Sequence, residues 1–179
     1  MRILFFTSVL FLISCTDQNI NSYINEEPKL NLRDFFNGDI YALGIFQDRS
    51  GQVVKRFKVD IKASWKGSKA ILDEEFSYSD GTKSTRIWEL EDLGKSKYEG
   101  RAGDVIGTAT GQTVGNVFYF VYNLDLPVGD TTYKVKFEDW MYLLDRNTLL
   151  ARSYMTKWGF YLGEVTIIMS KREKLEQDN

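Results

Sequence analysis

A regular alternation of apolar and polar residues runs through most of this chain and limits its fold more than any other feature. The clearest example is Val53–Trp65, where every second residue from Phe57 onward is apolar and the residues between them are mostly charged. Successive side chains of a β-strand point to opposite faces, so this pattern predicts an antiparallel strand with one buried face and one solvated face. The predicted buried face consists of Phe57, Val59, Ile61, Ala63 and Trp65.

Short turn sequences separate the alternating runs. They are RSGQ at Arg49, KGSK at Lys66, SDGT at Ser79, LGKS at Leu93, PVGD at Pro127 and DRNT at Asp145. The runs between them are rich in β-branched and aromatic residues, and only Leu32–Phe36 suggests a short helical turn. Many short strands joined by hairpins predict an all-β sandwich or barrel, and hairpins between sequence neighbours favour a single antiparallel up-and-down β-barrel of about 8–10 strands.

The N-terminal sequence MRILFFTSVLFLISC is typical of a lipoprotein signal peptide. Its apolar run, Ile3–Ile13, is too short to cross a bilayer as a helix and has the length of a signal-peptide core. The residues Leu12-Ile13-Ser14-Cys15 resemble the bacterial lipobox, so Cys15 is the predicted lipidation site. The alternatives are a simple secretory peptide with an incidental cysteine or a short buried helix.

These features divide the chain into four parts. Residues 1–14 form the predicted signal peptide, 15–31 the lipidated cysteine and a flexible tether, 32–172 the β-barrel domain and 173–179 a polar tail. The N-terminal acyl chains would anchor the protein to a membrane of the cell envelope, facing the periplasm. Thr16 rather than an aspartate follows the cysteine, which favours the outer membrane over the inner membrane.

The composition excludes several kinds of chemistry. The chain has no histidine, and its one cysteine is the predicted lipidation site, so Ser-His-Asp, Cys-His and His- or Cys-based zinc sites are excluded. The net charge of −2 gives no basic excess for binding nucleic acid. We expect a monomer with no cofactor. An enzyme would have to rely on Asp104, Asp139 or Glu164, and no catalytic motif surrounds them.

A glycine-rich run, Gly103–Asn116, interrupts the aromatic strands. Its alternation places Gly107, Ala109 and Gly111 on one face of a strand. Glycine within a strand marks a bend or a close approach of something bulky. The run therefore predicts either a barrel corner with small residues opposite large ones such as Trp88, or a thin wall that leaves room for a ligand.

Several charged residues share a face with apolar residues. Asp139 alternates with Phe137 and Met141 beside Trp140, and an unpaired buried charge is costly, so it needs a donor. Arg86 and Arg152 are the best candidates because their own faces are apolar. The favoured interpretation is a set of structural ion pairs that also includes Asp104 and Glu74. The alternative is a polar patch in an apolar cup that binds the head of a ligand.

Taken together, several stretches resemble a bacterial lipoprotein family catalogued as domain-of-unknown-function family 3833. The resemblance covers Leu32 to Lys171 and rests on FFNG at Phe35, GIFQDRSGQVVKRFKV at Gly44, LDEEFSYSDG at Leu72, RIWEL at Arg86, AGDVIGTATG at Ala102, GN at Gly115, FEDWMYLLD at Phe137 and MTKWGFYLGEVTI at Met155. Ala151 departs from an asparagine that is frequent in the family. The resemblance implies a small envelope lipoprotein with a lipocalin-like barrel, and it supplies no catalytic residues.

Two functional hypotheses from different classes follow. The first is a membrane-anchored barrel that binds a fatty acid or another amphiphile, with candidate ligand-binding residues Arg86, Asp104, Gly107, Gly111, Asp139, Trp140 and Arg152. The second is a structural or assembly partner of an envelope complex, with its contact surface around Tyr119 and Trp140. A cavity inside the barrel would favour the first, and a filled interior the second.

Overall fold

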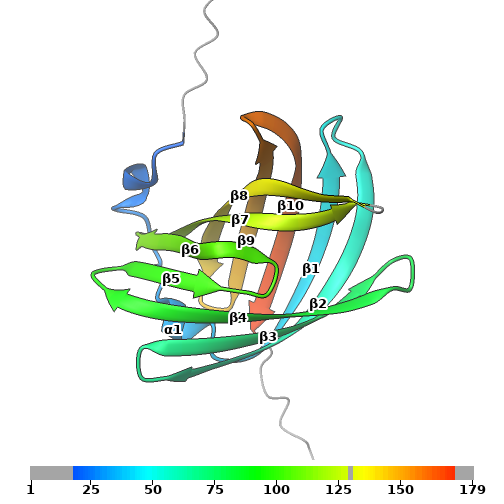
Figure 1. The fold of residues 1–179 in the computed structure, drawn as a ribbon. Helices are drawn as coiled ribbons and strands as arrows, with labels where there is room; N and C mark the ends of the chain where they lie inside the picture. Colours follow the sequence, from blue (N-terminus) through cyan, green and yellow to red (C-terminus); the bar gives the residue numbers. More distant parts are fainter. Residues whose placement is uncertain (1–17, 129–130, 172–179) are drawn as a thin grey trace, which may run out of the picture.

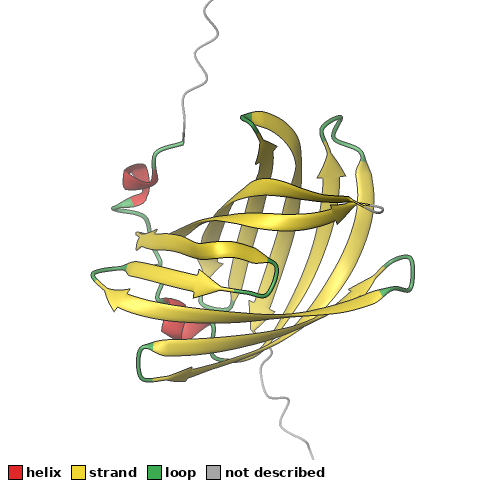
Figure 2. Ribbon diagram, viewed as in Figure 1, coloured by secondary structure: helices red, strands yellow, loops and turns green. Residues whose placement is uncertain are grey.

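The computed structural model describes residues 18–128 and 131–171, and in these ranges the chain forms a closed barrel of ten antiparallel strands (Figures 1 and 2). Each strand pairs with its neighbours in sequence, and β1 pairs with β10 to close the barrel. The strands are β1 Gly38–Asp48, β2 Val53–Lys66, β3 Lys69–Tyr78, β4 Lys83–Gly94, β5 Lys97–Arg101, β6 Val105–Val114, β7 Val117–Val128, β8 Thr131–Asp145, β9 Thr148–Lys157 and β10 Phe160–Lys171. The predicted all-β up-and-down barrel is confirmed, with a strand number at the top of the expected range.

The alternation in β2 places its side chains as predicted. Phe57, Val59 and Ile61 are buried inside the barrel, and the charged residues between them are exposed. The strand ends at the predicted KGSK turn, where Gly67 has a φ of +61° that favours glycine. The predicted PVGD turn reaches residues 129–130, which lie outside the described residues.

The predicted helical turn closes one end of the barrel. Helix α1, Leu32–Phe35, begins at Asn31, whose side chain accepts a hydrogen bond from the backbone N–H of Arg33. Both Phe35 and the adjacent Phe36 are buried, and the indole N–H of Trp65 donates to the Phe36 carbonyl at 2.8 Å. We call this the closed end. The opposite end, where the hairpins after β1, β3, β5 and β9 lie, is called the rim.

The segment before the barrel packs against the outer wall, which corrects its assignment as a flexible tether from residue 18 onward. It contains the short 3-10 helix η1, Ile20–Tyr23, and Ile20 is buried against Trp140 of β8. Tyr23 also contacts the Trp140 ring, with 6.5 Å between ring centroids. Cys15 and the predicted signal peptide lie outside the described residues.

Gly115, in the hairpin between β6 and β7, allows this segment to lie close to the wall. The backbone N–H of Leu30 donates to the Gly115 carbonyl at 2.8 Å. A Cβ atom on Gly115 would lie 1.7 Å from the Tyr23 carbonyl oxygen, and its φ of +58° also favours glycine. The contact explains why glycine occupies this position.

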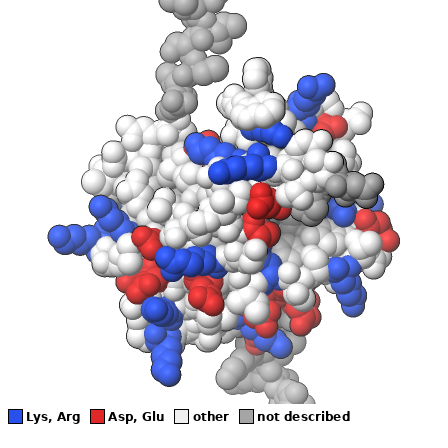
Figure 3. Space-filling model, in the orientation of Figure 1, with Lys and Arg blue, Asp and Glu red and all other residues white. Residues whose placement is uncertain are grey.

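The charged side chains at the surface are mixed in sign. On the face drawn in Figure 3, basic and acidic residues alternate without a large patch of either kind. In residues 18–128 and 131–171, no helix is long and apolar enough to cross a membrane.

Candidate functional site

The interior of the barrel holds a cavity of about 570 Å³. It extends from Phe36 at the closed end to Lys55 and Asp125 near the rim. Its apolar lining comes from strands on all sides and includes Phe46, Val59, Phe76, Phe118, Met141 and Ile167. The volume and the mostly apolar lining are typical of a pocket for a small molecule.

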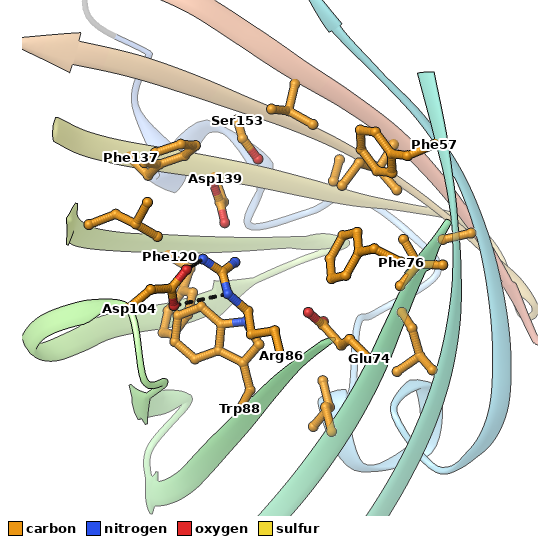
Figure 4. A pocket seen from close by; sticks show the side chains of 18 of the residues that line it. Phe57, Glu74, Phe76, Arg86, Trp88, Asp104, Phe120, Phe137, Asp139 and Ser153 are labelled. Atoms are coloured by element: carbon orange, nitrogen blue, oxygen red, sulfur yellow. Dashed lines mark hydrogen bonds and ion pairs between the residues drawn. The ribbon is translucent and has the colours of Figure 1, made fainter. Parts of the chain in front are cut away.

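Four charged side chains project into this apolar cavity from different strands, and we call them the inner polar patch. Glu74 comes from β3, Arg86 from β4, Asp104 from the connection after β5, and Asp139 from β8. Figure 4 shows the carboxyl groups of Glu74 and Asp139 on opposite sides of the Arg86 guanidinium. The patch therefore brings three carboxyl groups and one guanidinium together in a cavity whose walls are mostly apolar.

Arg86 and Asp104 form the ion pair of this patch. The Arg86 Nε–H donates to Asp104 Oδ1 at 3.1 Å, and its Nη2–H donates to Oδ2, which makes the contact bidentate. The two side chains are 22% and 40% exposed because they lie toward the rim. The guanidinium also lies over the Trp88 ring, 5.4 Å from its centroid.

Asp139 is the most deeply buried carboxyl of the patch. The residue is 6% exposed, and it lies between Phe120 of β7 and Ser153 of β9 in the sheet register. Burial raises the pKa of Asp139 to about 6, although the hydroxyl groups of Ser153 and Tyr122 and the charge of Arg86 act in the opposite direction. Its Oδ1 atom has no hydrogen-bond partner among the described residues. An acceptor in this position is available to a donor from a ligand.

Glu74 lies directly opposite Arg86 in the pairing of β3 with β4. Its side chain retains some accessible surface because it faces the cavity, yet the surrounding wall shields it from bulk water. Burial raises the pKa of Glu74 to about 7, with Arg86 opposing this shift and Asp104 and Asp139 adding to it. The pKa values of two carboxyl groups of the patch, Glu74 and Asp139, therefore lie near neutral pH.

The prediction that Asp139 binds Arg86 or Arg152 is wrong. Arg86 binds Asp104, and Arg152 binds Glu164, with its Nη2 atom 3.0 and 2.8 Å from the two carboxylate oxygens. The sequence placed Asp139, Arg86 and Arg152 on apolar faces, but the pairing depends on which strands lie opposite one another across the barrel.

The two glycines proposed for the ligand site have different surroundings. Gly111 lies in the wall below the Phe118 and Phe120 rings, and a Cβ atom there would come within 2.6 and 2.7 Å of them. Gly107 has a φ of +76° and lies at a bulge in the pairing of β6 with β7, where it is exposed. The space over Gly111 is therefore filled by aromatic rings of the protein.

Trp140 and Arg152 lie on the outside of the barrel. Trp140 is 6% exposed because η1 covers it, and Tyr119 packs on it with 4.4 Å between ring centroids. Arg152 projects from the outer face of β9 beside Tyr154. Neither residue lines the cavity. Of the candidate residues, Arg86, Asp104 and Asp139 are brought together.

Several polar residues of the cavity were absent from the candidates, and Glu74 and Ser153 lie nearest to Arg86 and Asp139. Glu74 alternates with Leu72 and Phe76, which was the available signal, since the same argument selected Asp139. Ser153 could not be found this way, because both faces of β9 contain apolar residues and the sequence favoured Arg152 next to it. The structure places Ser153 inside with Ala151 and Met155.

The chemistry available to the site is binding through an apolar wall, hydrogen bonding and proton exchange. Among the described residues, no group of three or more His, Cys, Asp or Glu side chains is arranged to hold a metal ion.

The barrel is similar to a solved structure, an S-type phycobiliprotein lyase, CPES, from Guillardia theta. The TM-score is 0.58 with 9% sequence identity, and the match covers 88% of this chain and 100% of the other. This likeness and the strand order establish a lipocalin-like fold, as predicted. No curated protein sequence matches the chain. A family model matches residues 9–171, and the chain belongs to that family, whose description is "Protein of unknown function (DUF3833)".

Proposed function

We propose that this protein is a binding module that holds an amphiphile, a fatty acid or another molecule with an apolar chain and a polar head, inside the barrel. The observation that carries the proposal is the cavity of about 570 Å³ with apolar walls and one polar patch. A chain could lie along Phe118, Met141 and Ile167 while its head reaches the inner polar patch.

The surface proposed for the alternative role, that of an assembly partner, is covered by the protein's own chain. Trp140, the centre of that surface, is covered by Ile20 and Tyr23 of the same chain. A filled barrel would also have favoured that role, and this interior is hollow. Both observations support binding of a small molecule over assembly.

The proposal includes a membrane anchor at Cys15 in the cell envelope, facing the periplasm, with the outer membrane favoured and the protein a monomer. Support comes from the lipobox-like sequence and from the rim, where Trp158 is 86% and Phe160 72% exposed. Lys157 lies 4.7 Å from the centre of the Trp158 ring. Aromatic residues beside a lysine are typical of surfaces at a membrane interface.

Organic extraction of the purified full-length protein, followed by mass spectrometry, tests the binding function. We expect a co-purified amphiphile, and we expect it to be lost from Ala151→Phe, because Ala151 lines the cavity and a phenylalanine there would occupy its space. The control is Thr166→Phe, which places the same ring on the outer face of β10, where residues alternate with the cavity-lining Val165 and Ile167. Equal extraction from both variants, at equal melting temperature, would contradict the proposal.

Labelling cells with radioactive palmitate tests the anchor. We expect label on the wild-type protein and none on Cys15→Ser, since a serine cannot form the thioether. Normal labelling of the variant would rule out Cys15 as the lipidation site.

A further inference from the structure

Acidic groups outnumber basic groups among the described residues that line the cavity. The carboxyl groups are those of Glu74, Asp104, Asp125 and Asp139, and the cations among the described lining residues are Lys55 and Arg86. Both cations are already bound to carboxylates of the protein. Lys55 Nζ lies 3.4 Å from Asp80, and Arg86 holds Asp104. Neither of these two cations is therefore left unpaired for the head of an anionic ligand.

Two carboxyl groups of the inner polar patch, by contrast, have no basic partner of their own. Asp139 is buried, its Oδ1 atom has no hydrogen-bond partner among the described residues, and it faces the cavity. Glu74 faces the same space from the opposite wall (Figure 4). A buried acceptor without a donor is costly, so a ligand that donates hydrogen bonds would gain more here than one that only accepts them.

We propose that the ligand of this cavity has a cationic, hydrogen-bond-donating head, an alkyl ammonium group, which Glu74 and Asp139 bind while the apolar wall holds its chain. This inference rests on the proposed function and narrows it, because it names the head group. An ammonium carries three donors and a positive charge, so it can satisfy Asp139 Oδ1 and a carboxylate oxygen of Glu74.

The same patch disfavours a ligand with a carboxylate head. It would need a donor in the patch, and the guanidinium of Arg86 is engaged by both oxygens of Asp104. It would also lie near Glu74 and Asp139, and like charges in a space of low dielectric repel one another. A neutral alcohol avoids the repulsion but offers one donor without a charge. The structure therefore predicts the order ammonium, alcohol, carboxylate.

Three probes with the same chain separate these cases. Dodecylamine, dodecanol and dodecanoate are titrated below their micelle concentrations into the purified full-length protein at pH 8, and binding is followed by calorimetry. We expect dodecylamine to bind at least ten-fold tighter than either of the others. Binding of dodecanol or dodecanoate at least as tight as that of the amine would overturn the inference and leave the proposed function standing. No binding of any probe would overturn both.

Paired variants connect the preference to the two carboxyl groups. The double variant Glu74→Gln/Asp139→Asn removes both negative charges with little change in shape. We expect it to bind dodecylamine at least ten-fold more weakly than the wild type does, and to lose much less affinity for the uncharged dodecanol. The control is Glu164→Gln, which removes a carboxylate on the outer face of β10 beside Arg152. Equal amine affinity in the double variant and the wild type would overturn the inference even if the amine binds.

The pH dependence gives a further readout. The groups that face Asp139 and Glu74 are Arg86, Asp104, Tyr122 and Ser153. Arg86 stays protonated throughout, whereas Glu74 and Asp139 lose protons between pH 5 and pH 8. Affinity for dodecylamine, which stays protonated in this range, should rise at least ten-fold. A flat or falling profile would contradict the inference.

Discussion

Two arginines of this barrel each bind both oxygens of one carboxylate, one inside the wall and one outside it. Arg86 and Asp104 lie in the cavity with Glu74 and Asp139 nearby, so one cation serves three carboxyl groups. Arg152 binds Glu164 on the outer wall, where the charges are balanced one to one. The comparison teaches that the contact geometry of an ion pair does not reveal its role, because the surrounding charges decide what else it can bind.

The largest difference between the two sites is expected in their response to pH. Burial raises the pKa of Asp139 to about 6, above its unfolded value near 3.8. A carboxyl group with a raised folded pKa leaves stability intact below the unfolded pKa and lowers it as the pH rises through the folded pKa. Asp139→Asn removes this penalty. It should raise the free energy of unfolding by up to about 3 kcal/mol at pH 8 and change it little at pH 4.

Urea unfolding of the wild type and Asp139→Asn at both pH values measures this difference. Glu164→Gln, outside the barrel, serves as the reference, because this carboxylate has an arginine partner and lies away from the cavity, so its loss should not raise the free energy of unfolding at pH 8. If Asp139→Asn is destabilised equally at pH 4 and pH 8, the residue is held by structural bonds that the asparagine breaks. That result would support the structural role of Asp139 that its sequence pattern favoured.

The second prediction concerns the imbalance inside the cavity. Arg86→Met leaves three carboxyl groups without their cation, so it should lower the free energy of unfolding by about 1–2 kcal/mol at pH 8, a value reduced by the partial exposure of the pair. The loss should shrink at pH 5, where Glu74 and Asp139 bind protons. Asp104→Asn should cost less than about 1 kcal/mol, because Arg86 then has two other carboxyl groups nearby. The measurement is urea unfolding. If Arg86→Met and Asp104→Asn lower the free energy of unfolding equally, Arg86 and Asp104 form an isolated ion pair and Arg86 does not also stabilise Glu74 and Asp139.

The sequence predicted the fold well where one face of a strand is charged. In β2 the charged residues Arg56 and Lys58 mark the outer face, so Phe57 and Val59 had to point inward, as they do. In β9 neither face is charged throughout. Arg152 alternates with Leu150 and Tyr154, and this apolar pattern wrongly suggested that it points into the barrel. An alternating pattern gives two faces but does not say which one is buried when both contain apolar residues.

The apolar outer face of β9 has a cause that alternation in the strands cannot show. Ile20 and Tyr23 cover part of the neighbouring wall at Trp140, and single apolar residues in a polar segment gave no sign of this. The site was predicted only in part for a related reason. Asp139 and Arg86 were both identified, but their separation depends on which strands lie opposite across the barrel, and nothing local in the sequence determines it.

The smallest effect is expected at the outer pair, and it completes the comparison. Arg152→Met and Glu164→Gln each break one surface ion pair, in which the Arg152 side chain is 45% exposed, so each should change the free energy of unfolding by less than about 1 kcal/mol. The two losses should be equal within error, because each charge has one ionic partner, the other residue of the pair. The double variant should lose no more than either single variant, since the first substitution already removes the contact. Unequal losses would mean that a further charged group reaches this pair and that the outer wall shares the imbalance of the cavity.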